Sequence, residues 1–284
     1  KKLRKQTPLI SITLPIYNAG LFLRQTLQSI QAQSYKNFEV VAVDDGSSDN
    51  SLAIFSEFAK KDHRFKIVKN KKNLGVGAAA NRTIFLSKGK YICRMDADDI
   101  MLPNRLKKQL AFLQKNPDYI AVGGQCIRID ENGVKTGMKV FPTDDKTIRS
   151  MVFQASPMQH PTIMVNTKKL PNNFPWFRTD LKIGEDNDLY YKLMKYGRMA
   201  NLDEPVIYYR EYLQNLTLTS AKKTFWYIWK SRIIAVTKYG YIPDFSSMIN
   251  VLAQTILVLL LPEKILYPLH LKTRKLFFRS SYVG

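Results

Sequence analysis

The sequence is poor in cysteine, in histidine and in negative charge, and each shortage excludes a class of protein. Its two cysteines, Cys93 and Cys126, are too few for a disulfide framework. With only three histidines, the chain also shows no zinc-type spacing of cysteine and histidine. Both cysteines lie in apolar runs, which predicts buried, unpaired thiols and a reducing, cytosolic environment.

The sequence shows neither the pattern of a signal peptide nor that of a transmembrane helix. The basic start KKLRKQTPLI is followed by no long apolar run and no cleavage site, so we expect no signal peptide. The longest apolar stretch near the C-terminus, Ile249 to Leu261, contains Asn250, Gln254 and Thr255 and stops at Pro262. It is shorter than the ~20 mainly apolar residues that a spanning helix needs, so we expect no transmembrane helix.

Negative charge is scarce, with 23 Asp+Glu against 44 Lys+Arg and a formal net charge of +21. This excess suits nucleic acid, an anionic membrane surface or phosphate-rich small molecules as partners. No repeat and no RNA-binding aromatic strand supports the first of these, and we expect no nucleic-acid partner. Basic residues crowd the tail, whereas the acidic ones gather in short clusters within the first two-thirds of the chain.

The first hundred residues alternate short β-branched runs with helical patterns, which is typical of βαβ units on a mostly parallel sheet. We expect strands in LISITLP, FEVVAVDD, FKIVK and YICRM, with helices over 21–31, 51–60 and 77–87. A helix should follow Pro103, and further strands should form in YIAVGGQCIRID and MQHPTIMV. GEDNDL should open a helix of about three turns that ends at Gly197, and the pattern is helical from about Ser220. These patterns predict an α/β fold.

Polar or acidic side chains follow three of these strands directly. They are Tyr17 and Asn18, the pair Asp44 and Asp45, and the segment 96–99. Because ligands bind outside the carboxyl ends of strands in open parallel sheets, we expect these side chains to meet at one rim. Asp44 and Asp45 could form a turn before the next helix, or accept a hydrogen bond from a base or a ribose.

The segment RMDADD sets three carboxylates, those of Asp96, Asp98 and Asp99, into four positions. Carboxylates this close repel one another unless a cation or a set of donors compensates them. One aspartate would suffice to cap the helix that follows. Three suit a hard divalent cation, Mn²⁺ or Mg²⁺, that bridges to substrate phosphates.

Two further motifs admit both a structural and a functional interpretation. GEDNDL places acidic residues at a helix start, where the macrodipole favours them anyway, or where one could act as a general base. His160 in MQHPTIMV could be a satisfied structural histidine or a ligand. The stretch NLGVGAAAN lacks both G-x-G-x-x-G and the Lys-Ser/Thr of a P-loop.

Taken in order, these motifs resemble a known family. SITLPIYN, VVAVDDGSSDN, NLGVGAAAN, YICRMDADDIMLPNRL, QHPTIMV and GEDNDLYYKL are similar to the motif series of inverting glycosyltransferase family 2, over about Leu9 to Thr217. The resemblance implies a GT-A fold, a Rossmann-like sheet flanked by helices, and a nucleotide-sugar donor. Bacterial members of this family build lipopolysaccharide, capsule or exopolysaccharide repeats.

Carried over to this sequence, the resemblance implies a role for each motif residue. Pro15 and Tyr17 would line the nucleotide pocket, Asp45 would bond the uracil or other base, and Asp96 would lie near the ribose. Asp98 would be the principal metal ligand, and Asp186 the base that deprotonates the acceptor hydroxyl. We expect supporting roles for Asn18, Asp44, Asn81, Asp99, His160, Glu185 and Arg210.

One position departs from the family pattern. Many relatives carry Tyr-Arg-x-His after the catalytic helix, and that histidine helps to hold metal or diphosphate, whereas this chain has YYREYLQNLT. Tyr212 stands where the histidine would be, so we leave it out of the metal site. Metal affinity would be weakened, or Arg210 and other basic groups would take over the diphosphate.

The sequence therefore predicts a GT-A domain over 1–218, with a donor half over about 1–100 and an acceptor half over about 101–218. We expect an inverting, metal-dependent hexosyltransferase that moves a sugar from a nucleotide-sugar, a UDP-sugar first, to a saccharide or lipid-linked acceptor in cell-surface polysaccharide synthesis. Two alternatives stay open. A nucleotidyltransferase should carry an early Gly-rich loop with Lys or Arg, which PIYNAG does not offer. A non-catalytic protein that binds membranes or polyanions would explain the net charge but not the aligned acidic clusters.

We expect residues 219–284 to form a helical, amphipathic, basic tail. Polar residues recur in it at helical spacing and leave an apolar face: Ser246, Ser247, Asn250 and Gln254. That face could pack on the catalytic domain. The flanking basic residues favour an anionic membrane surface instead, at the cytoplasmic face, and they are Lys264, Lys272, Arg274, Lys275 and Arg279.

Overall fold

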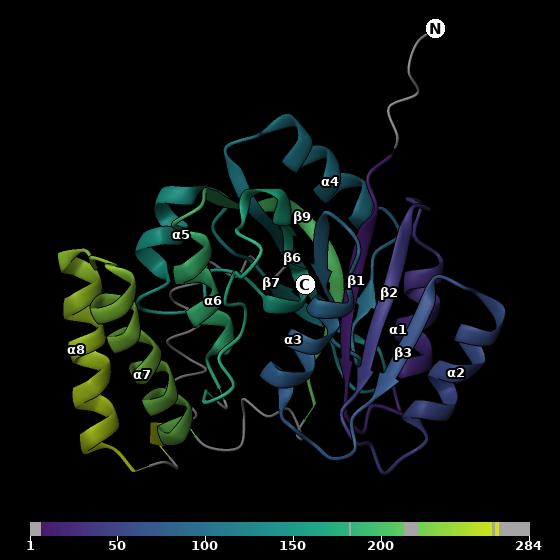
Figure 1. Cartoon of the computed structure of the whole chain (residues 1–284). Coiled ribbons are helices and arrows are strands. Elements are labelled where there is room, and N and C mark those ends of the chain that lie inside the picture. Colours follow the sequence, from purple (N-terminus) through teal and green to yellow (C-terminus); the bar gives the residue numbers. More distant parts are fainter. Residues whose placement is uncertain (1–6, 182, 213–220, 263–264, 267–284) are drawn as a thin grey trace, which may run out of the picture.

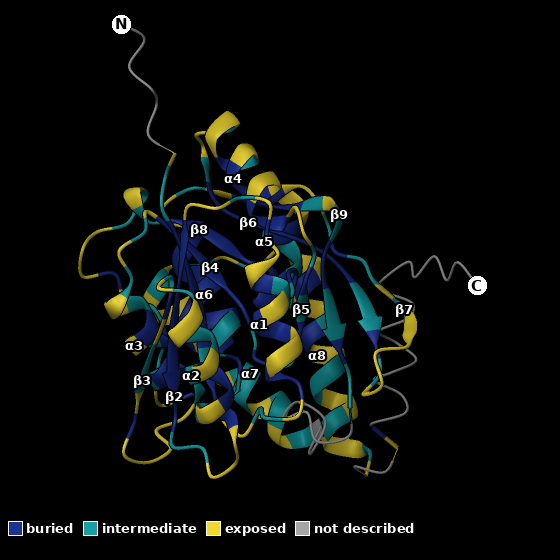
Figure 2. Cartoon of the chain, turned by 90° about the vertical axis from the view of Figure 1, so that its right-hand side faces the viewer, coloured by how far each residue is buried: buried dark blue, intermediate teal, exposed yellow. Residues whose placement is uncertain are grey.

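The computed structural model describes residues 7–181, 183–212, 221–262 and 265–266 (Figure 1). Within these residues nine strands form one sheet in the order β3-β2-β1-β4-β8-β6-β9-β5, with β7 beside β6. Helices flank the sheet, and the strands at its centre are the most deeply buried part of the molecule (Figure 2). The expected α/β fold is confirmed.

The first half of the sheet consists of parallel strands joined by helices. The elements are β1 (Ile10–Ile16), α1 (Leu23–Gln31), β2 (Phe38–Asp44), α2 (Ser51–Lys61), β3 (Phe65–Lys69), α3 (Val76–Leu86) and β4 (Tyr91–Arg94). Strand β1 pairs in parallel with β2 and β4, and β2 pairs in parallel with β3. Every residue of β2 is buried, because parallel strands are covered on both faces. The predicted βαβ units are therefore confirmed.

The second half of the sheet is mixed. Its elements are β5 (Ile100–Met101), α4 (Arg105–Lys115), β6 (Tyr119–Ile129), β7 (Lys135–Lys139), α5 (Asp145–Met151), β8 (Met164–Asn166), α6 (Glu185–Leu193) and β9 (Arg198–Arg210). Strand β8 runs antiparallel to both β4 and β6, and β6 and β9 are parallel. Short β5 pairs antiparallel with the end of β9, which brings the segment after β4 next to Arg210.

Two expected elements are shorter than the sequence pattern predicts. The strand expected in MQHPTIMV begins only at Met164, because His160–Thr162 forms a 3₁₀ turn around Pro161, which has no N–H for a ladder. Helix α6 ends at Leu193 rather than at Gly197. Gly197 instead lies against backbone, where a Cβ atom would stand 2.7 Å from the Asp118 carbonyl oxygen.

Two C-terminal helices pack beside α5 and α6. They are α7 (Ala221–Tyr239) and α8 (Phe245–Leu260), and they lie side by side at the edge of the molecule beyond α5 and α6 (Figure 1). Ala235 of α7 and Val251 of α8 belong to the same hydrophobic cluster as buried residues of α5 and α6. The division at 218/219 stays a prediction, since these helices share a core with the acceptor half.

The membrane predictions can be compared with the described part of the tail. Among the described residues no helix is both long enough and apolar enough to span a membrane. The basic residues expected to flank the apolar helix, Lys264, Lys272, Arg274, Lys275 and Arg279, lie outside the described residues. Cys93 and Cys126 are buried and unpaired, as the apolar runs around them predict.

A buried glutamine connects α4 to β6 and to the 3₁₀ turn at His160–Thr162. The Gln109 side chain on α4 is fully buried, and its Nε2 donates to the carbonyl oxygens of Val122 and Thr162 at 2.9 and 2.7 Å. Its Oε1 accepts from Nε of the buried Arg105 at 3.0 Å. Buried polar groups of this kind are costly to leave unpaired.

We expect Gln109→Met to lower the free energy of unfolding by about 2–4 kcal/mol, because the substitution preserves volume but leaves these partners without a hydrogen bond. Lys107→Met, at an exposed position of the same helix, should change it by less than about 0.5 kcal/mol. Urea denaturation of both variants measures the difference. Equal effects would show that the buried hydrogen bonds do not matter to stability.

Candidate active site

The carboxyl ends of β1 and β2 lie together, as the sequence predicts. Ile16 and Asp44 are partners in the parallel register, and the Asp45 N–H donates to the Ile16 carbonyl oxygen at 2.8 Å. Pro15 is half-buried at the end of β1, whereas Tyr17 beyond it is 52% exposed. An aromatic ring at this rim is available to a planar ligand.

Asn18 shapes the loop that follows. It has a φ of +48°, a left-handed conformation that asparagine tolerates better than most residues. Its Oδ1 accepts from the Ser48 N–H at 2.9 Å, and its own N–H donates to Ser47 Oγ at 3.0 Å. Asn18 thus ties the loop after β1 to the loop after β2.

The two adjacent aspartates differ in what they already bind. Asp45 is buried and accepts from Asn70 Nδ2 at 2.6 Å and from the N–H groups of Leu74 and Gly75 at 3.0 and 2.9 Å. Its carboxylate therefore fixes the loop between β3 and α3. Asp44 is fully buried, and its Oδ2 has no hydrogen-bond partner among the described residues. A base bound here would share Asp45 with the protein's own amides, so base recognition by Asp45 stays a prediction.

Asn81, another predicted supporting residue, binds backbone. Its Nδ2 donates to the Phe177 carbonyl oxygen at 2.8 Å, and its Oδ1 accepts from the Phe177 N–H at 2.9 Å. This pair of hydrogen bonds fastens the segment around Phe177 to α3. Asn81 thus supports the site by holding that segment in place.

The acidic segment after β4 is compensated by several separate partners. Arg94 Nη2 lies 2.7 Å from Asp96 Oδ1, the Tyr212 hydroxyl donates to Asp98 Oδ2 at 2.9 Å, and the Arg210 N–H donates to Asp99 Oδ1 at 2.8 Å. Asp99 is fully buried, and its Oδ2 has no partner among the described residues.

Burial and mutual repulsion raise the pKa values of two of these carboxyl groups. Burial, and then the Asp96 charge, raise the pKa of Asp98 to about 6. Burial and the charges of Asp98 and Asp96 raise the pKa of Asp99 well above its ordinary value. Burial and neighbouring negative charge thus both disfavour the ionised forms of these carboxyl groups. A cation bound here would favour the ionised forms and lower these pKa values.

The Arg210 side chain belongs to the framework of this segment. Its Nε donates to the Asp98 carbonyl oxygen at 3.0 Å, and its Nη1 donates to the carbonyl oxygens of Asp130 and Glu131, each at 3.0 Å. Nη2 donates to Gln25 Oε1 at 2.7 Å. These contacts place Arg210 beneath the acidic segment and occupy the donors that a diphosphate would need.

The acidic start of α6 supplies the second group of carboxylates. Burial raises the pKa of Asp186, and burial and the Asp186 charge raise the pKa of Glu185 to about 8. The Asp96 charge raises the pKa of Asp98 and Asp99 on one side and of Glu185 and Asp186 on the other. Asp96 therefore couples electrostatically to both groups, and its partner Arg94 also influences the pKa values of Glu185 and Asp186.

Asp188, the third acidic residue of GEDNDL, has a different surrounding. Its Oδ1 accepts from the Tyr239 hydroxyl at 2.8 Å, and its Oδ2 lies 2.7 Å from Lys192 Nζ. Asp188 is fully buried, and the hydrogen bond from Tyr239 ties α6 to α7, whereas the ion pair with Lys192 lies within α6.

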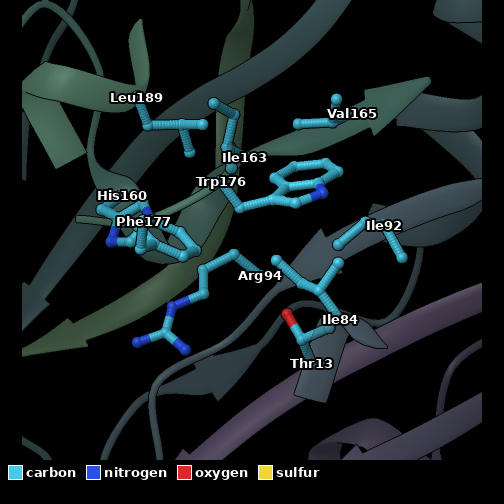
Figure 3. Close-up of a pocket in the computed structure, with 10 residues that line it drawn as sticks. All are labelled: Thr13, Ile84, Ile92, Arg94, His160, Ile163, Val165, Trp176, Phe177 and Leu189. Atoms are coloured by element: carbon cyan, nitrogen blue, oxygen red, sulfur yellow. The ribbon is translucent and has the colours of Figure 1, made fainter. Parts of the chain in front are cut away.

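His160 lies beside the site in a small pocket with Arg94 (Figure 3). Its ring packs edge-on against Phe177 at a centroid distance of 5.3 Å, and its Nε2 has no hydrogen-bond partner among the described residues. Burial, and then the positive charge of Arg94, hold the pKa of His160 well below its ordinary value. His160 is therefore neutral at pH 7, and Figure 3 shows its ring on the same side of the pocket as the Arg94 guanidinium.

The described residues contain no cluster of three His, Cys, Asp or Glu side chains arranged to hold a metal ion. Mn²⁺ and Mg²⁺ bind nucleotide sites through one or two carboxylates and take their other ligands from phosphates and water. The hard oxygen donors of Asp98 and Asp96, with raised pKa at Asp98, fit such an ion.

Two residues of the site were not predicted as part of it. Arg94 pairs with Asp96, and the signal was present, because residues two apart along an extended segment point to the same side. Tyr212, which the sequence analysis left out of the metal site, contacts the predicted metal ligand Asp98 through its hydroxyl. Its place at the position of the family histidine was the feature of the sequence that could have identified it.

The comparisons with known proteins agree with this geometry. The EpsE protein of Bacillus subtilis (strain 168) is 34% identical over 208 residues, covering 72% of this chain and 73% of its own. Residues 1–349 of TarS from S. aureus, solved in complex with UDP-GlcNAc, superpose with a TM-score of 0.67 at 21% identity, covering 88% of this chain and 72% of that one.

The mannosyltransferase PcManGT from Pyrobaculum calidifontis, solved with GDP-Man and Mn²⁺, gives a TM-score of 0.58 at 17% identity, covering 93% and 84% of the two chains. At these identities the solved structures show the shared GT-A fold alone. The sequence of residues 11–172 matches glycosyl transferase family 2, which is more than half of the chain. Together with the carboxylate geometry, this match shows that the chain is a glycosyltransferase that belongs to glycosyl transferase family 2.

Proposed function

We propose that this chain transfers a hexose from a nucleotide-sugar to a hydroxyl of a saccharide or lipid-linked acceptor, with inversion at the anomeric carbon. The proposal rests on two groups of carboxylates, at the end of β4 and at the start of α6, whose pKa values both respond to Asp96, which pairs with Arg94 at 2.7 Å. The group at the end of β4 suits the diphosphate of a donor, and the group at the start of α6 suits the acceptor hydroxyl.

The choice of base rests on the protonation of the two carboxyl groups at the start of α6. Glu185, with a pKa of about 8, keeps its proton at pH 7 and cannot accept another. Asp186 Oδ1 accepts the Asn187 N–H at 2.8 Å, and such a bond stabilises the ionised form. A raised pKa brings Asp186 closer to neutral pH, where a general base is most effective. We therefore propose Asp186 as the base.

In the proposed reaction Asp186 takes the proton of the acceptor hydroxyl as its oxygen attacks the anomeric carbon. The new glycosidic C–O bond forms while the bond to the diphosphate oxygen breaks, and the electron pair leaves with the nucleoside diphosphate. Mn²⁺ or Mg²⁺ held by Asp98 and Asp96 would supply neutralising charge to that leaving group. Tyr212 and Arg210 orient the acidic segment from behind.

Donor and acceptor are proposed from chemistry and likeness. A UDP-sugar is proposed first, and TarS, a structural neighbour, was solved with UDP-GlcNAc. Pro15, Tyr17, Asp44 and Asp45 would receive the nucleotide at the ends of β1 and β2. We further propose that the acceptor belongs to cell-surface polysaccharide synthesis and is presented at the cytoplasmic face of a membrane. A tail rich in basic residues supports that location.

We expect transfer to require Mn²⁺ or Mg²⁺ and Asp98→Asn to abolish it while the fold is retained, because asparagine keeps the shape but loses the charge that holds the cation. A panel of UDP-, GDP- and dTDP-sugars, assayed for donor hydrolysis and transfer with and without EDTA, measures this. Asp203→Asn, at an exposed position, is the matched control and should keep full activity. Near-normal turnover in EDTA would refute the metal assignment.

Asp186→Asn should retain nucleotide binding and lose sugar transfer by about two to four orders of magnitude, the usual contribution of a positioned base. Calorimetric titration of UDP and single-turnover transfer separate these effects. Glu185→Gln should be far less impaired in transfer. An inactive Glu185→Gln beside an active Asp186→Asn would show that the base is the other carboxylate.

Stability should depend on pH through Glu185. Its pKa is about 8 in the folded chain and ordinarily near 4.5, so between these values the folded state holds a proton that the unfolded state has released. Stability therefore falls as pH rises through this window. Glu185→Gln removes the effect, so its Tm should match that of wild type near pH 4.5 and exceed it by several degrees at pH 8. Thermal scans in EDTA test this, and a constant difference at both pH values would contradict it.

A further inference from the structure

Helix α8 turns its polar side toward the protein. Ser247 Oγ donates to the Ser150 carbonyl oxygen at 3.0 Å, and Asn250 Nδ2 donates to Gln154 Oε1 at 2.8 Å. Arg232 of α7 donates to Gln254 Oε1 at 3.2 Å. Three of the four polar residues that the sequence analysis singled out, Ser247, Asn250 and Gln254, therefore attach α8 to the rest of the molecule.

The opposite side of α8 is apolar and exposed. We call it the outer face, and it consists of Phe245, Met248, Ile249, Leu252, Ile256, Leu259 and Leu260, which are 45% to 75% exposed. No charged residue occurs anywhere between Phe245 and Leu260. Ile242, in the turn before α8, extends the same surface at 89% exposure. The surface of a soluble protein is seldom apolar over a whole helix face, and large exposed apolar patches mark sites of interaction with proteins or membranes.

A cationic groove adjoins the outer face. It has a volume of about 650 Å³, and Lys146, Arg149 and Lys195 line it together with Ile242. Arg149 is paired with Asp145 at 2.7 Å, and the carboxylate of Asp244 also lines the groove. The exposed Lys146 and Lys195 still leave the groove with net positive charge. Apolar side chains next to lysines suit an anionic lipid surface, because the apolar side chains can contact the acyl chains while the lysines contact the lipid phosphates.

The charge of the chain decides between a bilayer and a second copy as occupant. A second copy would bring another net charge of +21 against the first, and such charge disfavours self-association. After Asp244 the sequence contains five Lys or Arg residues and one acidic residue, Glu263, so positive charge also dominates the chain that follows α8. An anionic bilayer gains from both features.

We propose that α8 lies in the headgroup region of an anionic lipid bilayer with its outer face toward the acyl chains, and that Lys146 and Lys195 contact lipid phosphates. This deepens the proposed membrane location of the enzyme by naming the surface, and it does not depend on transfer activity. Helix α6 carries Asp186 at its first turn, and its C-terminal end leads to the groove at Lys195. Nine residues at 1.5 Å each place the site about 14 Å along α6 from the groove.

The test uses the full chain and two kinds of lipid vesicle, one of phosphatidylcholine alone and one that also contains about 30% phosphatidylglycerol, an anionic lipid. We expect cosedimentation with the anionic vesicles. The double variant Leu252→Glu/Ile256→Glu should lose at least tenfold in partitioning, since both side chains lie on the outer face. Lys146→Gln/Lys195→Gln should lose roughly 25-fold on anionic vesicles, about fivefold per basic side chain, and little on neutral ones.

The matched control is Phe85→Glu/Val134→Glu, which places the same charges at exposed apolar positions away from α8 and should bind as wild type does. Circular dichroism and UDP titration establish that each variant is folded, and they separate a failure of docking from a failure of the proposed activity. Equal vesicle binding by wild type and Leu252→Glu/Ile256→Glu would overturn the proposal. So would a dimer in sedimentation equilibrium that the same variant converts to a monomer, because the outer face would then serve a second copy.

Discussion

The contacts of Arg210 are the constraint on which the acidic site depends. One guanidinium at the end of β9 reaches carbonyl oxygens of the segment after β4 and of the turn between β6 and β7, and it reaches Gln25 of α1. Its main-chain N–H holds the buried Asp99. The ring of Phe22 stacks under it at 4.3 Å. Without this group, backbone carbonyls and a buried carboxylate from separate parts of the chain would be left unpaired, which is among the costliest defects in a folded protein.

Tyr212 shows how the departure from the family pattern fits this framework. A phenol hydroxyl with a raised pKa stays neutral and donates to one oxygen of Asp98, which leaves the other oxygen for a cation. Burial, and then the Asp98 charge, cause that raised pKa. The Phe22 ring also packs against Tyr212, at 5.2 Å. A histidine could ligate a metal itself, whereas this tyrosine orients the carboxylate that we propose as the ligand.

The sequence predicts what depends on local pattern and fails where a partner lies far away along the chain. Strands β1 to β4 and the rim at their ends follow from periodicity, because parallel pairing brings their carboxyl ends together. Asn81 was expected to have a supporting role, but the sequence does not show that its partner is the backbone of Phe177, 96 residues later. The pattern in α8 predicts an amphipathic helix, but only the contact with Gln154 reveals that the polar side points inward. No local rule contains that information.

Helix α6 joins the proposed chemistry to the proposed docking surface. Its start carries Glu185 and Asp186, and its middle is fixed to α7 by the Tyr239 hydroxyl, which donates to Asp188. Within α6, Asp188 also forms a buried ion pair with Lys192. Buried ion pairs contribute little net stability but tolerate few alternative arrangements. The α7 helix in turn holds α8 through Arg232 and Gln254. A bilayer that fixes the outer face of α8 would therefore fix the height and tilt of Asp186 as well, so that an acceptor anchored in the same bilayer meets the base at a constant depth.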